Sequence, residues 1–149
     1  MALRDVKEED LPILFEHQRE PKAIRMAAWP ARDYDAFMTH WHTKVLGSPS
    51  AKKKTIVVDG EVAGNIGSWE QDGKRLVGYW IGQAYWGRGV ATVALTEFVA
   101  DHEQPRPVYA YVATQNVGSI RVLEKCGFVQ VGEAMTGHDG VEEVLMKLL

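Results

Sequence analysis

Residues 77–100, VGYWIGQAYWGRGVATVALTEFVA, decide how the rest of the chain is organised. The first letters, VGYWI, are rich in β-branched and aromatic residues, which is typical of a strand. The last letters, VATVALTEFVA, place apolar residues at helical spacing, so that one stripe can face a sheet. Between them lies WGRG, residues 86–89. The stretch therefore predicts a strand, a glycine-rich turn and a helix.

The glycine-rich turn is a candidate anion site. Backbone N–H groups in the first turn of a helix have no partners inside the helix, and they point outward at the positive end of the helix dipole. Gly87 and Gly89 permit positive φ angles and let a phosphate approach the backbone. A turn that uses glycine only for its tight geometry explains the same letters, and this stretch alone leaves both interpretations open.

Two familiar phosphate-binding patterns do not fit this turn. The P-loop ends in Gly-Lys followed by Ser or Thr, and no lysine follows Gly89. The dinucleotide-binding pattern needs a third glycine at the position of Thr92. A nucleotide-binding domain of either type is therefore disfavoured.

A second stretch, residues 116–128 (NVGSIRVLEKCGF), favours the phosphate site. Together with WGRGVA, residues 86–91, it closely resembles the GNAT superfamily of acyl-CoA-dependent N-acetyltransferases, in the branch of the RimJ/RimL-type ribosomal-protein N-terminal acetyltransferases. The resemblance covers residues 76–132 and is weak before them. It implies an α/β (mixed α+β) GNAT fold, with a central, mostly antiparallel twisted sheet of about seven strands. Strands 4 and 5 would form a splayed parallel pair, with helices on both faces.

The resemblance also implies where acetyl-CoA binds. In the family, the turn before the long helix holds the pyrophosphate, and the preceding strand pairs its backbone with the pantetheine arm. The asparagine that opens the next helix lies beside the pantetheine and the reacting centre. For the Arg88 side chain, contact with phosphate and simple exposure to solvent remain alternatives. The implied cofactor-binding residues here are Trp80, Ile81, Gly82, Trp86, Gly87, Arg88, Gly89, Val90, Ala91, Thr92, Asn116 and Ser119.

Two positions depart from the family pattern. Trp86 stands where the superfamily often has Gln or Arg, which is common in the RimJ/RimL-like branch. Leu123 stands where many members carry a tyrosine that acts as general acid to the leaving thiolate. The acid must therefore be another group or solvent. Ser119 best matches a serine proposed as this donor in RimL-like enzymes.

The implied reaction is direct attack of a neutral amine on the thioester in a ternary complex. It needs a base or water chain for the amine, a strand N–H near Ile81 for the carbonyl oxygen, and a hydrogen-bond donor for the thiolate. Glu70 is the first candidate base because it ends the strand beside the cofactor strand, although an exposed hairpin carboxylate is a slightly better interpretation. Tyr111 is a further catalytic candidate. Like Tyr79, it lies on a splayed strand, where a cleft-wall role is more common. Cys126 lies near a helix C-terminus, which disfavours a thiolate nucleophile.

Length and composition limit the alternatives. The 149 residues fit one domain, and we expect residues 1–149 to form a single GNAT N-acetyltransferase domain. No apolar run reaches the roughly 20 residues of a membrane span, and the N-terminus has no apolar signal core. The lone Cys126 agrees with a reducing compartment. We therefore expect a cytoplasmic protein without a membrane partner.

Charge and histidine spacing argue against two other kinds of partner. A net charge of −3 disfavours general binding of nucleic acid. The basic run at residues 52–54 is interpreted as a solvated turn. The five histidines are scattered, so no metal site is expected.

The order of elements follows from the periodicities and turn residues. Asp10 is the expected N-cap of a first helix ending near Gln18, and a short helix is expected within residues 20–32. Strand 108–113 must run parallel to strand 76–82, because strand–helix–strand crossovers are right-handed. The other expected strands are 2–6, 55–58, 61–70, 128–133 and 141–148, and the other expected helices are 33–45, 89–102 and 116–127.

Two function classes follow. The first is an N-acetyltransferase acting on the primary amine of a protein N-terminus or a small molecule, and the alternative is a GNAT-fold module that binds acyl-CoA without turnover. Leu123 keeps the alternative open. The acceptor would bind between the first two helices and the last hairpin. That hairpin could also pair across a homodimer. Arg25, Met26 and Trp29 are candidates to line that site, although ordinary packing explains them better.

Overall fold

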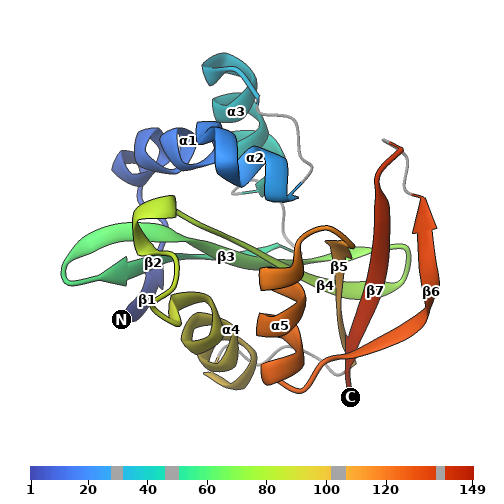
Figure 1. Cartoon of the computed structure of the whole chain (residues 1–149). Helices are drawn as coiled ribbons and strands as arrows, with labels where there is room; N and C mark the ends of the chain where they lie inside the picture. Colours follow the sequence, from blue (N-terminus) through green and yellow to red (C-terminus); the bar gives the residue numbers. More distant parts are fainter. Residues whose placement is uncertain (28–31, 46–50, 102–106, 137–139) are drawn as a thin grey trace.

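Seven strands form one sheet in the order β1-β2-β3-β4-β5-β7-β6 (Figure 1). The computed structural model describes residues 1–27, 32–45, 51–101, 107–136 and 140–149. All neighbouring strands run antiparallel except β4 and β5, so the predicted mixed sheet is confirmed. The strands are β1 (Ala2–Asp5), β2 (Lys52–Val58), β3 (Glu61–Gln71), β4 (Lys74–Ile81), β5 (Val108–Ala113), β6 (Val129–Thr136) and β7 (Glu142–Leu148).

Helices cover both faces of the sheet, as predicted. Figure 1 shows α1, α2 and α3 on one face and α4 and α5 on the other. No helix within the described ranges is long and apolar enough to cross a membrane. The helices are η1 (Glu8–Asp10), α1 (Leu11–Arg19), α2 (Pro21–Ala27), α3 (Tyr34–His40), the π-helical turn η2 (Trp41–Val45), η3 (Gln83–Tyr85), α4 (Val90–Asp101) and α5 (Val117–Lys125).

The parallel pair separates soon after it forms. Only Arg75 and Leu76 of β4 pair with β5, opposite Val108 and Tyr109. Beyond that point β4 continues alongside β3 as far as Ile81, without β5. The predicted splay between strands 4 and 5 is therefore confirmed, and it opens the sheet at the end of β4.

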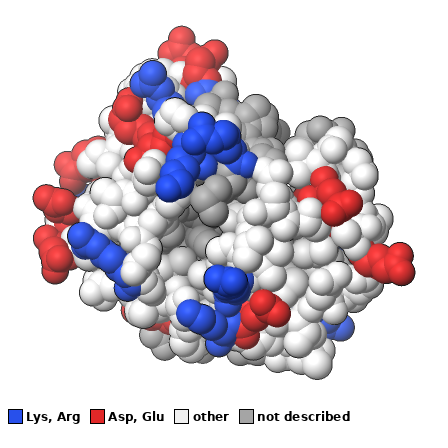
Figure 2. All heavy atoms as spheres, viewed as in Figure 1, with Lys and Arg blue, Asp and Glu red and all other residues white. Residues whose placement is uncertain are grey.

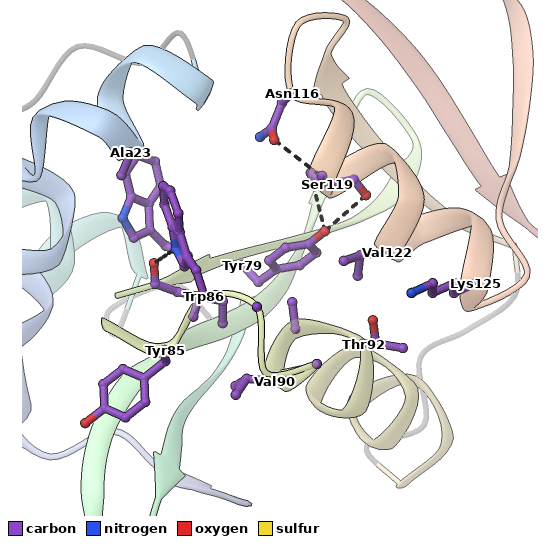
Figure 3. A pocket seen from close by; sticks show the side chains of 16 residues that line it. Ala23, Tyr79, Tyr85, Trp86, Val90, Thr92, Asn116, Ser119, Val122 and Lys125 are labelled. Carbon is purple, nitrogen blue, oxygen red and sulfur yellow. Dashed lines mark hydrogen bonds between the residues drawn. The ribbon is translucent and has the colours of Figure 1, made fainter. Parts of the chain in front are cut away.

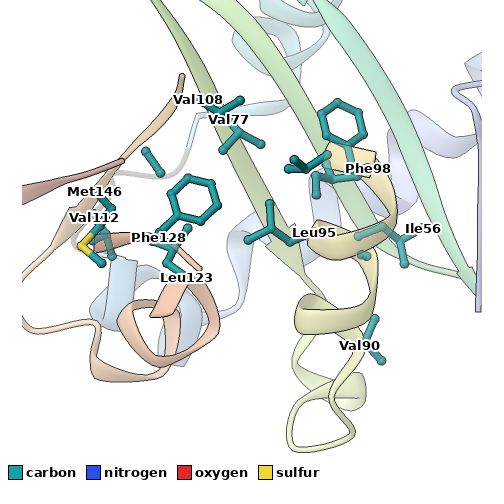
Figure 4. Close-up of a cluster of buried hydrophobic side chains, with 14 of the residues drawn as sticks. Ile56, Val77, Val90, Leu95, Phe98, Val108, Val112, Leu123, Phe128 and Met146 are labelled. Carbon is teal, nitrogen blue, oxygen red and sulfur yellow. The ribbon is translucent and has the colours of Figure 1, made fainter. Parts of the chain in front are cut away.

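Two hydrophobic clusters hold the layers together. The larger one lies between the sheet and the helices α4 and α5, and it contains fully buried Leu95, Phe98 and Phe128 (Figure 4). The smaller cluster joins α1 to α3 through Leu11, Leu14, Phe15, Phe37 and Trp41. The predicted apolar faces of these helices are thus their packing faces.

Asp10 differs from its predicted role. Its carboxylate does not cap α1. It accepts hydrogen bonds from the Arg4 guanidinium, the Lys7 backbone N–H and the Thr55 hydroxyl. Burial alone would raise the pKa of Asp10, but these donors outweigh burial and lower the pKa to about 2. Asp10 therefore ties the start of α1 to β1 and β2.

The basic run also differs from the prediction. Lys52, Lys53 and Lys54 belong to β2 and do not form a solvated turn. Successive side chains of a strand point to opposite faces of a sheet. Lys54 pairs with Asp5 of β1, whereas Lys53 lies on the face that carries α1 and α3. Strand geometry thus separates neighbouring lysines that look equivalent in the sequence.

Candidate active site

The first cavity lies where the sheet opens, between the end of β4, the glycine-rich turn and α5 (Figure 3). Its volume is about 440 Å³, within the range usual for small-molecule sites. All of the predicted cofactor-binding residues line it except Gly82 and Arg88. Tyr79, expected on a cleft wall, also lines it, and sequence reasoning missed the remaining lining residues, which are Ala23, Tyr85, Gly118, Val122 and Lys125.

The glycine-rich turn needs its glycines for backbone conformation. Gly87 and Gly89 have φ angles of 78° and 74°, a left-handed region that other residues rarely adopt. A Cβ atom at either position would meet no other atom within 4 Å, so space is not the reason. The turn leads directly into α4 at Val90, so the first N–H groups of α4 border the cavity.

The backbone of β4 is divided between β3 and the cavity. The N–H of Gly82 donates to the carbonyl of Ala63 at 2.8 Å. Because alternate residues of an antiparallel strand form hydrogen bonds with the same neighbouring strand, the backbone N–H and carbonyl of Trp80 also face β3. The backbone N–H and carbonyl groups of Tyr79 and Ile81 face the gap left by β5. The carbonyl of Ile81 accepts a hydrogen bond from the Trp86 indole at 2.9 Å.

Trp80 and Gly82 therefore differ from their predicted use as backbone partners of a ligand. Trp80 lines the cavity through other atoms, and its indole N–H donates to the carbonyl of His17 at 3.1 Å. Gly82 lies against the His17 ring, where an added Cβ would be 2.7 Å from Nε2. His17 is buried, and this burial lowers its pKa. These contacts fix α1 against the end of β4.

Basic groups surround the first cavity. The Arg88 side chain is exposed and its guanidinium lies 5.5 Å from the Tyr85 ring centroid. Lys125, at the end of α5, lines the cavity, and the ammonium of Lys22 lies 5.9 Å from the Trp86 ring centroid. Figure 2 shows Lys and Arg side chains on both sides of the hollow, over α2 and beside α5. This arrangement favours an anionic ligand.

Three polar side chains meet at the inner end of the first cavity (Figure 3). The Asn116 side-chain oxygen accepts from the backbone N–H of Ser119 at 3.3 Å, so the predicted cap is confirmed. The Tyr79 hydroxyl lies 2.7 Å from Ser119 Oγ. Burial raises the pKa of Tyr79 to about 12, so its phenol is protonated near neutral pH. Sequence reasoning placed Tyr79 on a cleft wall and missed this hydrogen bond, because no local spacing links β4 to α5.

A second cavity of about 320 Å³ lies on the other side of these residues. Tyr79, Trp80, Asn116 and Ser119 line both cavities. Side chains of α1, α3 and β2 to β5 form the rest of its wall, including Tyr111, which is 46% exposed. The two cavities thus meet at the splay of β4 and β5.

Several candidates lie away from both cavities. Glu70 lies opposite Arg75 at the start of β4, with 3.8 Å between Oε1 and the guanidinium, and it lines neither cavity. Cys126 also lines neither and contacts Thr96 and the Thr92 carbonyl. Leu123, in contrast, borders the second cavity, although it is only 1% exposed and packs in the core.

Other candidates give little further information. Arg25 is exposed and lines neither cavity, while the Met26 side chain and Trp29 lie outside the described residues. Among the residues that the structure describes, no group of three His, Cys, Asp or Glu side chains is placed to hold a metal ion.

Solved structures of acetyltransferases share this fold. The spermidine N-acetyltransferase from Vibrio cholerae, in complex with CoA and spermine, superposes with a TM-score of 0.82 at 14% identity, covering 99% of this chain and 94% of that one. A GNAT-family acetyltransferase from Bacillus anthracis gives a TM-score of 0.79 at 18% identity, covering 99% and 93%.

An aminoglycoside acetyltransferase, AAC(6')-Ib, is also similar. In its complex with paromomycin and acetyl-CoA, it gives a TM-score of 0.76 at 25% identity, covering 98% of this chain and 91% of that one. No curated protein sequence matches the chain. Residues 1–129 match the family described as "Acetyltransferase (GNAT) domain". That match covers most of the 149 residues, so the chain belongs to the GNAT acetyltransferase family.

Proposed function

We propose that this protein transfers an acetyl group from acetyl-CoA to the primary amine of a small molecule or a peptide N-terminus. The observation that carries this proposal is the meeting of two cavities at Tyr79, Asn116 and Ser119. One cavity has the basic rim and free helix N-terminus that suit a pyrophosphate, and the other opens toward α1 and α3. Two substrates can therefore bind at once and react where the cavities join.

Acetyl-CoA fits the first cavity by its chemistry. Backbone N–H groups from Gly87 to Thr92 would bind the pyrophosphate, with Lys125 adding positive charge. The outward-facing backbone of Tyr79 and Ile81 would pair with the amides of the pantetheine arm. When bound, acetyl-CoA supplies an activated acetyl thioester. The Ile81 N–H is suited to stabilise the thioester carbonyl oxygen as it gains negative charge.

Ser119 and Tyr79 would assist the departure of the thiolate. Either hydroxyl can donate in the 2.7 Å contact between Tyr79 and Ser119 Oγ. In the arrangement proposed here Tyr79 is the donor, which leaves the Ser119 hydroxyl hydrogen available for the sulfur. A thiol has an ordinary pKa near 8.5, well below the pKa of about 12 of Tyr79, so a hydrogen bond to sulfur is favoured over full proton transfer from the phenol. Tyr79 thus acts as a positioning residue for Ser119.

The amine would lose its proton to water or to the imidazole of His40, which lines the second cavity. The described lining of both cavities contains no Asp or Glu side chain. Glu70, the candidate base, lies at the opposite end of β4 from Ile81. The roles of Glu70 and Tyr111 stay predictions; of the two, only Tyr111 borders a cavity.

Two finer assignments also stay proposals. Trp86 and Ser119 support a place in the RimJ/RimL-like branch of the family. The β6–β7 hairpin supports a homodimer contact, because β6 is the edge strand and exposes Val129, Val131 and Met135. A molecular mass near 16.7 kDa in light scattering would contradict the dimer.

Calorimetry with acetyl-CoA tests the central proposal, with ATP and NAD as controls. We expect micromolar affinity for acetyl-CoA alone. Release of free CoA in the presence of an amine panel then separates an enzyme from a module that binds acyl-CoA without turnover. Binding without CoA release from any amine would support the module, and no binding would remove the cofactor assignment.

A further inference from the structure

Lys53 lines the second cavity, and its surroundings indicate which kind of acceptor binds there. The inference drawn from Lys53 rests on the proposed function. Lys53 of β2 lies across β3 at Gly67, where an added Cβ would be 2.4 Å from the Lys53 Cδ atom. Glycine at position 67 therefore provides the room that the lysine stem needs. The Lys53 ammonium lies 5.1 Å from the Trp41 ring centroid, and it borders the cavity. The ammonium is thus held in the wall of the cavity by β3 and η2.

Lys53 also differs from its neighbour in having no ionic partner. Lys54 pairs with Asp5 on the outer side of β2. Within the described ranges, no Asp or Glu oxygen lies within 4.0 Å of the Lys53 ammonium. Burial lowers the pKa of Lys53 to about 8, which still leaves it mostly protonated at neutral pH. A partly buried ammonium without a counter-charge is a site where an anionic ligand gains affinity.

The rest of the cavity wall carries further basic side chains. Arg32 and His40 line it together with Lys53, and its described lining contains no carboxylate. Its apolar surface includes the aromatic side chains of Trp41, Trp69 and Tyr111. A polyamine or an aminoglycoside would bring several positive charges against this wall, and like charges in a confined site oppose binding. An amine that also carries a negative group and an apolar portion matches the wall.

We propose that the acceptor is a primary amine bearing a carboxylate, with Lys53 binding the carboxylate while the amine reaches Ser119. Amino acids and their close analogues are the simplest members of this class. The ammonium of a lysine side chain such as Lys53 is a compact charge, and it does not by itself distinguish a carboxylate from a phosphate. An aminoalkyl phosphate therefore belongs in the same panel, where a preference for it over the carboxylates would overturn the carboxylate assignment.

Matched acceptor pairs test this inference. The panel contains phenylalanine against phenylalaninamide, tryptophan against tryptamine, and spermidine as a polycation. We expect kcat/KM to be at least about tenfold higher for each carboxylated amine than for its partner without a carboxylate, as for one charge-assisted contact. Amidation lowers the pKa of the amine and increases its neutral fraction, so for the phenylalanine pair this bias acts against the expected result. The amine of tryptamine is more basic than that of tryptophan, so kcat/KM for that pair is compared per neutral amine. Equal or better turnover of the amide, tryptamine or spermidine would overturn the inference.

Two lysine variants identify the residue. Lys53→Met removes the ammonium and keeps the apolar stem, so we expect the preference for the carboxylated amine to fall to about one. Lys54→Met is the matched control, because its ammonium faces Asp5, and it should keep the preference. If Lys53→Met slows amines with and without a carboxylate equally, Lys53 acts on the amine itself and the inference is wrong.

Calorimetry gives a readout that does not depend on turnover. With CoA present, N-acetylphenylalanine should bind the wild type at least about tenfold more tightly than Lys53→Met, and N-acetylphenylalaninamide should bind both equally. Equal affinity of the two compounds for the wild type would overturn the inference while leaving acetyl-CoA binding intact. Failure to bind acetyl-CoA would instead contradict the proposed function.

Discussion

The two cavities are lined by different kinds of groups. Most of the first cavity is formed by consecutive residues between Tyr79 and Thr92, which make the open edge of one strand, a glycine-rich turn and a helix N-terminus. Residues of α2 and α5 complete its wall. The second is assembled from side chains of α1, α3, η2 and four strands. Backbone groups suit a ligand shared by a whole family, whereas side chains determine which acceptor binds. Variants should therefore separate cofactor binding from acceptor binding.

The largest expected effect is on the backbone of the first cavity. Gly89→Val places a β-branched residue at a φ of 74°, which costs on the order of 1–3 kcal/mol unless the turn rearranges. Rearrangement displaces the N–H groups at the start of α4. We expect acetyl-CoA affinity in calorimetry to fall about a hundredfold, as those hydrogen bonds are lost.

Gly60→Val is the matched control for this variant. Gly60 has a φ of 79° and equally open surroundings, but it lies in the β2–β3 turn and lines neither cavity. The control should be destabilised by a similar amount in thermal unfolding and should bind acetyl-CoA normally. Unchanged affinity in Gly89→Val would remove the pyrophosphate from this turn.

The second effect concerns the junction of the cavities. Ser119→Ala should lower kcat about thirtyfold, because a hydrogen bond to a developing charge is lost, and acetyl-CoA affinity should change little. Tyr79→Phe should lower kcat less, and combining the two should add little, since Tyr79 acts through Ser119. Single-turnover kinetics provide the measurement. Cys126→Ala is the control, and a larger loss there than in Ser119→Ala would reverse our assignment.

The third effect tests whether the second cavity depends on its supports. Asp10 joins α1 to β2, and both elements line that cavity. Its folded-state pKa of about 2 lies below the usual value of 3.8, so its contribution to stability is present above pH 4 and disappears as the pH falls through 2. Asp10→Asn should reduce the free energy of unfolding by about 2 kcal/mol at neutral pH.

Denaturant titrations at several pH values measure this contribution. The difference between the wild type and Asp10→Asn should shrink between pH 4 and pH 2. Glu9→Gln is the control, because the Glu9 side chain is 77% exposed and should contribute little. The acceptor KM of Asp10→Asn should rise more than its Kd for acetyl-CoA, and the opposite order would mean that both cavities share this support.

The smallest expected effect is on a single hydrogen bond at the first cavity. Trp86→Phe keeps most of the ring packing and removes the indole donor to the Ile81 carbonyl. We expect acetyl-CoA affinity to fall about threefold, which corresponds to one neutral hydrogen bond. A rise in affinity would mean that the freed Ile81 carbonyl accepts from the ligand better than from the indole.

The sequence by itself predicted the elements whose cause is local. The strands expected at 55–58, 61–70 and 76–82 are separated by Asp59-Gly60 and Asp72-Gly73, which carry the positive φ angles that join antiparallel strands. The strand, turn and helix around Gly87 and Gly89 placed most of the first cavity's lining, because consecutive residues build it. The handedness of crossover connections made β4 and β5 parallel.

Only the tertiary structure decided the features that join distant segments. Asp10 has the sequence context of a helix cap, but Arg4 and Thr55 compete successfully for its carboxylate. The Tyr79–Ser119 hydrogen bond and the Lys53 ammonium in the second cavity depend on strand register and on how helices pack against the sheet. Backbone preferences act over a few residues and can be recognised in the chain, whereas side-chain contacts across the sheet are fixed only by packing.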